Sequence, residues 1–228
     1  MAGPSLWRNT ALLAALFAAL VLVGGATGAA VGFAPAGSPT GVKVAASKAQ
    51  MSTLELQAHL ARLGYLPPQA VTSVRDDRTR EAIAGFQAWE GLARDGVADS
   101  STVARLAVAS RPIPLPGSGA RIEVHLDRQV VLLVRGNRVE RAIHVSTGAP
   151  GTPTPRGHFR IYRKERESWS VPFRVWLPWA SYFTRGIAFH GYPEVPAYPA
   201  SHGCVRVPLA EASTVYGFAR LGLPVRVV

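Results

Sequence analysis

The single cysteine of this chain lies near two histidines, and this grouping is the clearest sign of chemistry in the sequence. Cys204 stands within the run SHGCVR, which includes His202, and His190 lies a short distance upstream. A thiol attacks carbonyl carbons as its thiolate, and a neighbouring imidazole is a common means of forming a thiolate near neutral pH. The pattern therefore indicates a cysteine nucleophile with a histidine base.

Two other interpretations of these residues stay open. A lone cysteine is often a small buried apolar residue, but His202, Gly203 and Arg206 are poor neighbours for an apolar core. Gly203 instead permits close approach of the backbone, which suits an oxyanion site made of main-chain N–H groups. Alternatively, His190, His202 and Cys204 could bind zinc, because catalytic zinc commonly has three protein ligands. The sequence contains no Cys-x-x-Cys or His-Glu-x-x-His spacing to support zinc.

His190 and the SHGCVR run together resemble the signature of the L,D-transpeptidases, the YkuD-like cysteine enzymes of bacterial peptidoglycan. Three further runs are similar to that family, namely VSTG and TPRGHF within residues 145–159 and IAFHG at residues 187–191. The resemblance covers about Arg121–Val228. It implies a mainly β sandwich that carries an acyltransferase site, and we expect no cofactor and no metal.

The expected mechanism gives each residue of the signature a role. Cys204 would attack the carbonyl of a donor peptide while His190 takes the thiol proton. Backbone groups around His202, Gly203 and Cys204 would hold the oxyanion. The main-chain carbonyl of Gly191 would orient His190, because glycine has no side chain for that task.

Substrate contacts are expected beside these groups. The guanidinium of Arg206 matches the geometry of a substrate carboxylate, although a structural salt bridge would explain it equally well. The expected substrate-binding residues are Ser201, Arg206, Tyr192 and Tyr182.

The resemblance also implies the substrates. The donor would be a tetrapeptide stem whose third residue is a diamino acid, and transfer to the side-chain amine of another stem would make a 3→3 cross-link. Transfer to water would make the enzyme an L,D-carboxypeptidase. Carbapenem-type β-lactams would acylate the same thiol. The alternatives from other classes are a zinc peptidase and a non-catalytic wall-binding protein.

Helical patterning precedes this region. Ser52 with Glu55 three residues later forms a predicted capping box at the start of a first helix. A second helix is predicted from Asp77 to Glu90 and a third from Ser100 to Ala107. A segment as short as residues 51–108 buries only a small core, so three short helices are the economical fold.

This helical segment resembles the peptidoglycan-binding domain family. It departs from the family pattern between Leu66 and Arg78, so the segment is either a glycan-binding module or a spacer. Trp89 is interpreted as a core residue, with a saccharide platform as the alternative. The matching residues include Leu56, Gln57, Leu60, Leu63, Gly64, Tyr65, Phe86, Gln87, Asp95 and Gly96.

The pattern changes to that of β-strands after about residue 120. Ile122, Val124 and Leu126 alternate with polar residues, and Val130–Val134 is a continuous apolar run. A helix is predicted from Leu209 to Leu221, with Pro208 at its start and Gly222 after its end. Further strands are predicted at Val139–Val145, His158–Arg163, Val171–Leu177, Ile187–His190, Cys204–Val207 and Val225–Val228. We therefore expect a sandwich with one or two helices.

The first residues have the pattern of an export signal or a membrane anchor. An apolar stretch covers Thr10–Val23 and follows the single charge of Arg8, with no further charge until Lys43.

The formal net charge of the chain is +11, but basic runs typical of nucleic-acid binding are missing from the sequence. Expected partners are therefore peptidoglycan stems, glycan and anionic wall polymers rather than nucleic acid, and we assume a monomer.

The sequence divides into five predicted segments. They are a signal or anchor at 1–36, a linker at 37–50, the helical domain at 51–108, a Pro/Gly linker at 109–120 and the catalytic domain at 121–228.

Overall fold

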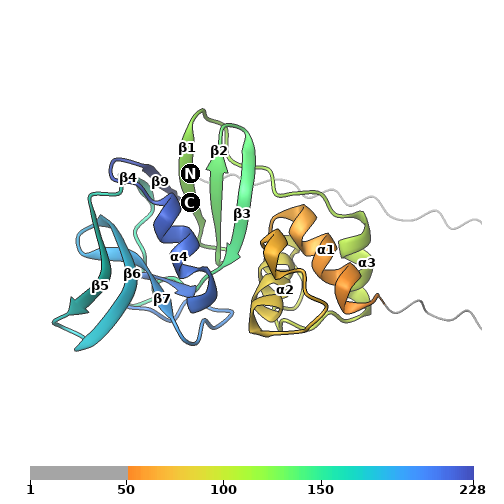
Figure 1. Cartoon of the computed structure of the whole chain (residues 1–228). Helices are drawn as coiled ribbons and strands as arrows, with labels where there is room; N and C mark the ends of the chain where they lie inside the picture. Colours follow the sequence, from red (N-terminus) through yellow and green to blue (C-terminus); the bar gives the residue numbers. More distant parts are fainter. Residues whose placement is uncertain (1–50) are drawn as a thin grey trace, which may run out of the picture. The chain divides into compact units, whose positions relative to one another are not determined.

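Three helices begin the part of the chain that the structure, a computed structural model, describes, namely residues 51–228 (Figure 1). The predicted export segment and the 37–50 linker lie outside these residues. The predicted capping box is confirmed, since Ser52 and Glu55 exchange hydrogen bonds at the start of α1. The helical elements are α1 (Thr53–Leu63), the short 3₁₀ helix η1 (Pro68–Ala70), α2 (Asp77–Glu90) and α3 (Ser100–Val108).

Two β-sheets and one helix follow, which confirms the predicted fold class. The first sheet has the strand order β3-β2-β1-β9-β4, and the second has the order β5-β6-β7-β8. The pairs β1–β9 and β7–β8 are parallel, and the other neighbours are antiparallel. The strands are β1 (Ala120–His125), β2 (Val130–Arg135), β3 (Arg138–His144), β4 (Gly157–Arg160), β5 (Arg163–Ser170), β6 (Val175–Thr184), β7 (Ile187–Tyr192), β8 (Val205–Pro208) and β9 (Pro224–Val227), and the helix is α4 (Leu209–Phe218).

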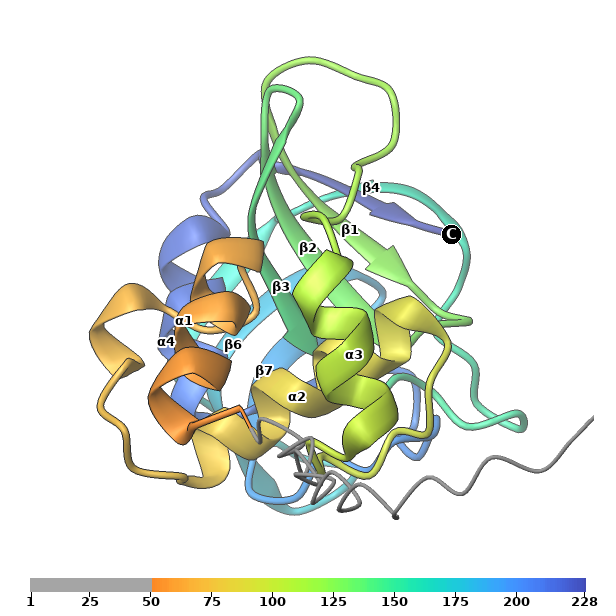
Figure 2. The same ribbon diagram turned by 90° about the vertical axis from the view of Figure 1, so that its right-hand side faces the viewer.

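The continuous apolar run of β2 is explained by burial on both of its faces. Val130, Leu132 and Val134 belong to a core that they share with α1, α2 and α3. Val131 and Leu133 belong to a second core, which lies between the two sheets. Figure 2 shows the three helices in front of β2 and β3. The helical segment and the sheet thus share one of the two main cores of residues 51–228.

The structure corrects the sequence prediction in the middle of the β region. Residues 171–174 form a turn, not the beginning of the predicted strand Val171–Leu177. The strand β5 was not predicted, because its sequence RKERESWS shows no apolar alternation. β5 lies at the edge of its sheet and most of its side chains are at least partly exposed, so charged residues are tolerated there.

Smaller corrections concern the ends of elements. The predicted strand His158–Arg163 divides into β4, which ends at Arg160, and the start of β5. Helix α4 ends at Phe218, three residues before the predicted end. The chain turns there so that the Gly222 N–H donates to the carbonyl of Ile161 at 2.8 Å. No helix within residues 51–228 is long and apolar enough to cross a membrane.

Candidate active site

Strands β7 and β8 place the histidine and the cysteine of the signature on one side of their sheet. In the parallel register, His190 pairs with Arg206 and Phe189 pairs with Val205. Side chains alternate along a strand, and directly paired residues point to the same side. Phe189 and Val205 contribute to the core between the sheets, so His190 and Arg206 face away from it. Cys204 directly precedes β8 and lies two residues before Arg206, which gives it the same side as His190.

The orientation of the His190 ring is fixed by the backbone. His190 is buried, with 4% of its surface exposed, and its Nδ1 lies 2.9 Å from the carbonyl oxygen of Gly191. Because a carbonyl only accepts hydrogen bonds, Nδ1 must carry the proton, and Nε2 of the neutral ring is left as an acceptor. Glycine at 191 suits the close approach of α4, since a Cβ there would lie 2.9 Å from the end of the Leu209 side chain and 3.0 Å from the Ala212 Cβ.

The surroundings favour neutral forms of both side chains. Burial lowers the pKa of His190, and the charge of Arg206 adds to this, although the hydrogen bond with Gly191 opposes it. Burial raises the pKa of the Cys204 thiol, against the opposing effects of the Ala188 backbone and Arg206. Both shifts favour a thiol and a neutral imidazole in the resting site.

This electrostatic state gives a testable pH dependence. Because burial raises the pKa of the Cys204 thiol, alkylation by iodoacetamide should reach half its maximal rate at a higher pH than alkylation of a cysteine in an unstructured peptide. Intact mass spectrometry across a pH series would measure this rate, and the single cysteine makes the label specific. Half-maximal alkylation at a lower pH than that of the peptide would instead reveal a preformed thiolate–imidazolium pair.

A tight turn from Ser201 to Cys204 presents the thiol. Ser201 Oγ accepts a hydrogen bond from the Gly203 N–H at 3.1 Å and donates one to the Cys204 carbonyl at 2.5 Å. Gly203 has φ of +110°, a conformation that favours glycine. Thr154 Oγ1 donates to the Gly203 carbonyl at 2.7 Å and so fixes the turn from behind. The N–H of Gly203 is engaged in the turn, so an oxyanion at Cys204 would rely on other donors.

The side chains of the predicted site line one pocket of about 660 Å³, which we call the Cys204 pocket. The backbone positions Gly191 and Gly203 support the pocket without lining it. The side chains predicted for catalysis and substrate binding that line it are His190, Cys204, His202, Ser201, Arg206, Tyr192 and Tyr182.

One wall of the Cys204 pocket was missed by the sequence analysis. It is the end of the β5–β6 hairpin, where Trp169, Phe173 and Val175 line the pocket although each is at least 43% exposed. The ring of His202 stacks on Phe173 with centroids 4.6 Å apart. The hydroxyl of Tyr182 is already bonded to Ser168 at 2.8 Å, so Tyr182 offers the pocket its ring more than its hydroxyl. The cluster of apolar residues within this charged stretch was a sequence signal that could have indicated the wall.

The described part of the chain contains no ligand set for the alternative zinc site. Among residues 51–228, no three His, Cys, Asp or Glu side chains lie close enough to share a metal ion. His202 lies against Phe173, and the Nδ1 of His190 is taken by the Gly191 carbonyl.

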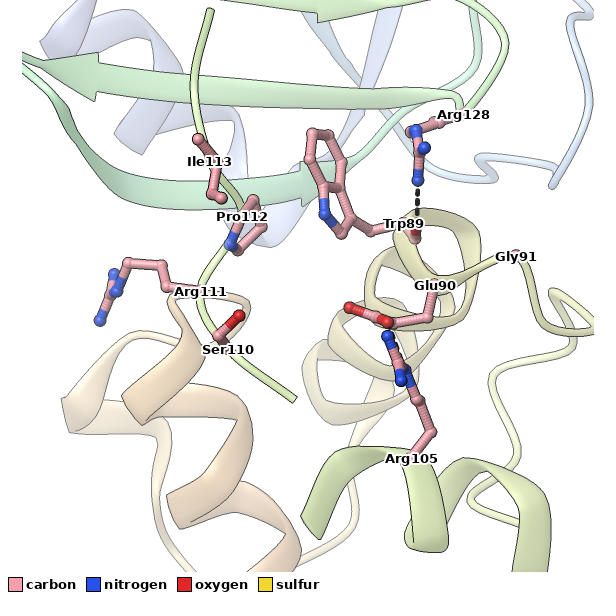
Figure 3. Close-up of a pocket in the computed structure, with 9 residues that line it drawn as sticks. All are labelled: Trp89, Glu90, Gly91, Arg105, Ser110, Arg111, Pro112, Ile113 and Arg128. Carbon is pink, nitrogen blue, oxygen red and sulfur yellow. Dashed lines mark hydrogen bonds and ion pairs between the residues drawn. The ribbon is translucent and has the colours of Figure 1, made fainter. Parts of the chain in front are cut away.

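Trp89 lies beside a different pocket, of about 510 Å³, between the end of α2, the start of the 109–120 linker and Arg128 (Figure 3). The guanidinium of Arg128 lies over its ring, 4.7 Å from the centroid, and the His125 ring packs edge-on at 5.1 Å. Trp89 also packs against the core shared by helices and sheet. These contacts favour a packing role for Trp89 over a saccharide platform.

Comparisons with known families agree with this geometry. The family model of the L,D-transpeptidase catalytic domain matches residues 119–227, and that of a peptidoglycan-binding domain matches residues 52–106. No curated protein matches the chain.

Several solved structures are similar to this chain. An L,D-transpeptidase from Xylanimonas cellulosilytica is 35% identical with a TM-score of 0.71, and the match covers 77% of this chain and 92% of that one. An L,D-transpeptidase from Stackebrandtia nassauensis is 25% identical with a TM-score of 0.51, over 77% and 90% of the two chains. L,D-transpeptidase 3 from Mycobacterium tuberculosis, solved with a faropenem-derived adduct, is 20% identical with a TM-score of 0.44, over 49% and 60%. Because the Xylanimonas enzyme is 35% identical over 77% of this chain and 92% of its own, this chain belongs to the L,D-transpeptidase family.

Proposed function

We propose that this chain is an exported L,D-transpeptidase that makes 3→3 cross-links in peptidoglycan through a thioester on Cys204. One observation carries the proposal most strongly. His190 on β7 and Cys204, directly before the parallel strand β8, line the same pocket, and the Gly191 carbonyl holds His190 with Nε2 as the acceptor. A thiol and an unprotonated imidazole nitrogen in one pocket support the proposed pairing of a nucleophile with its base.

In the acylation step, the Cys204 sulfur attacks the carbonyl carbon of the third residue of a donor tetrapeptide. The thiol proton moves to Nε2 of His190 as the C–S bond forms. The C–N bond to the fourth residue then breaks, and the leaving amine takes the proton back from the imidazolium. The pKa of His190, lowered mainly by burial, favours this return of the proton.

In the second step, the side-chain amine of another stem attacks the thioester carbon. A C–N bond forms, the C–S bond breaks, and the amine proton passes by way of His190 to the leaving sulfur. Water in place of the amine would release the tripeptide stem, which is the L,D-carboxypeptidase alternative. The guanidinium of Arg206 lies in the Cys204 pocket, where it can meet a carboxylate of the stem.

The remaining parts of the proposal concern location and partners. Residues 52–106 match a peptidoglycan-binding domain, and the enzyme acts on the cell wall. We propose export directed by residues 1–36 and action as a monomer in the wall or periplasm, with the basic chain drawn to anionic wall polymers.

Covalent labelling tests the proposed nucleophile. Wild-type protein incubated with a carbapenem should gain the mass of one adduct, and the Cys204→Ala variant should gain none, as measured by intact mass spectrometry. A disaccharide–tetrapeptide substrate should then give cross-linked dimers with the wild type alone. A folded wild type that forms no adduct and no dimer would refute the proposed function.

A further inference from the structure

A second pocket adjoins the Cys204 pocket on the side of the helical segment. It measures about 580 Å³, and we call it the Arg80 pocket. Tyr192 and Arg206 line both pockets, so a ligand in the Arg80 pocket would lie next to the reaction centre. The residues that line the Arg80 pocket are Arg80, Glu81, Tyr192, Pro193, Glu194, Val195, Pro196, Tyr198, Ala200 and Arg206.

The shared boundary carries a charge that both pockets can use. The guanidinium carbon of Arg206 lies 4.2 Å from the centre of the Tyr192 ring. Within residues 51–228, Arg206 forms no ion pair with a carboxylate. A structural salt bridge therefore does not account for Arg206, and its charge is available to substrate carboxylates.

The far wall of the Arg80 pocket is held in place by hydrogen bonds. The carbonyl of Val195 accepts from His144 Nε2 at 3.0 Å, and the carbonyl of Tyr198 accepts from Ser146 Oγ at 2.7 Å. The N–H of Ala200 donates to the Thr147 carbonyl at 2.9 Å. Anchored on β3 and on the chain that follows it, the segment 193–200 forms a fixed surface, which lowers the entropic cost of binding a ligand.

The charges in the Arg80 pocket are of both signs. Arg80 comes from α2 and pairs with Glu81 at 3.2 Å and with Asp77 at 3.5 Å, whereas Arg206 adds a positive charge without an ion-pair partner among residues 51–228. Glu194 is exposed and has no ion-pair partner among the described residues. A stem peptide carries an ammonium group on its diamino acid and a carboxylate at its end. The pocket therefore offers a partner for each charge of such a peptide.

We propose that the Arg80 pocket binds the acceptor stem peptide, with Glu194 attracting its side-chain ammonium and Arg80 its carboxylate. This inference rests on the proposed function and deepens it, because α2 of the peptidoglycan-binding segment would then recognise the acceptor directly. The bound ammonium loses its proton to solvent before the amine attacks the Cys204 thioester. The C–N bond then forms, the C–S bond breaks, and the second amine proton ends on the sulfur.

Partition of the acyl-enzyme between two products tests the inference. With a tetrapeptide stem as donor and acceptor, Glu194→Gln and Arg80→Gln should each lower the ratio of cross-linked dimer to hydrolysed tripeptide about three- to tenfold. The rate of carbapenem adduct formation should stay within about twofold of wild type, because acylation needs no acceptor. Glu140→Gln, which removes a carboxylate on β3 outside both pockets, is the matched control and should leave the ratio unchanged.

The possible outcomes separate the two proposals. A product ratio that neither variant changes, with normal adduct formation, overturns the acceptor site and leaves the nucleophile intact. Loss of adduct formation in the two variants places these residues in donor binding and also overturns the inference. A wild type that forms no adduct overturns the proposed function, and the acceptor site with it.

Discussion

Replacing His190 by alanine is expected to slow acylation of Cys204 about 10²- to 10⁴-fold, the range that a general base contributes. Burial raises the pKa of the Cys204 thiol, so little thiolate exists near neutral pH without a base. His190 lies in the Cys204 pocket with its Nδ1 proton given to the Gly191 carbonyl, which leaves Nε2 as the acceptor for the thiol proton. The growth of the carbapenem adduct with time, followed by intact mass spectrometry, measures the rate.

Two histidine controls make this result specific. His158→Ala changes an exposed residue on β4, outside the Cys204 pocket, and should acylate at the wild-type rate. His202→Ala removes the ring that stacks on Phe173 and should have a smaller effect than His190→Ala. If His202→Ala abolished acylation while His190→Ala left it nearly unchanged, His202 would be the base.

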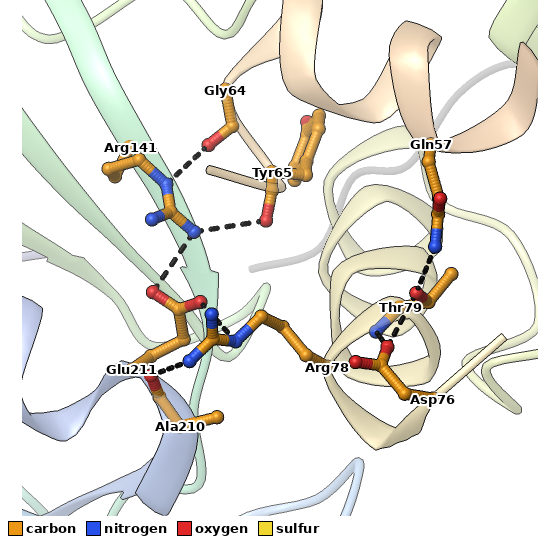
Figure 4. A network of polar contacts seen from close by, with 9 residues as sticks. All are labelled: Gln57, Gly64, Tyr65, Asp76, Arg78, Thr79, Arg141, Ala210 and Glu211. Atoms are coloured by element: carbon orange, nitrogen blue, oxygen red, sulfur yellow. Dashed lines mark hydrogen bonds and ion pairs between the residues drawn. The ribbon is translucent and has the colours of Figure 1, made fainter. Parts of the chain in front are cut away.

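Replacing Glu211 by alanine is expected to lower the free energy of unfolding by about 3–5 kcal/mol, the cost of breaking a buried ion pair. Glu211 on α4 is 5% exposed and lies 3.0 Å from Arg141 Nη2 and 3.7 Å from Arg78 Nε (Figure 4). The Arg141 contact is an ion pair rather than a well-aligned hydrogen bond. Without Glu211, the largely buried guanidinium of Arg141 would keep its contacts with the Gly64 and Tyr65 carbonyls but lose its counter-charge.

Urea unfolding of the wild type and the variant measures this difference through the midpoint and the slope of the transition. Glu140→Ala is the matched control, because the Glu140–Arg135 pair is exposed and should contribute no more than about 1 kcal/mol. Equal, small losses in both variants would show that the Glu211 network contributes little. The network joins α2 and β3 to α4, which packs on β7, so a loosened α4 should also slow acylation.

The sequence predicted the parts of the site that are local. The thiol and the imidazole lie on two short segments that the sequence identified, and the parallel pair β7–β8 brings those segments together. Helix caps were predictable for the same reason, since Ser52 and Glu55 are three residues apart. By contrast, the hairpin wall of the Cys204 pocket was missed, because β5 is an exposed edge strand without an apolar pattern.

Long-range polar contacts could not be predicted from the sequence. Arg141 and Glu211 look like ordinary surface charges in sequence, and only the packing of α4 beside β3 and the helical segment buries them together. The Arg80 pocket was missed for a similar reason, since it joins α2 to a loop more than a hundred residues later. Burial of β2 on both faces did have a signal, namely the absence of any polar residue from Val130 to Val134.

The burial of both faces of strand β2 has a consequence for how such enzymes evolve. Its residues Val130, Leu132 and Val134 are covered by the helical segment, so a catalytic domain that lost this segment would expose an apolar stripe to water. Gene rearrangements that exchange helical segments between relatives must therefore preserve the matching stripe or replace it with polar residues. Polar residues at these three positions would then mark lineages with an independent catalytic domain. Apolar residues there would mark lineages in which both segments are inherited as one unit.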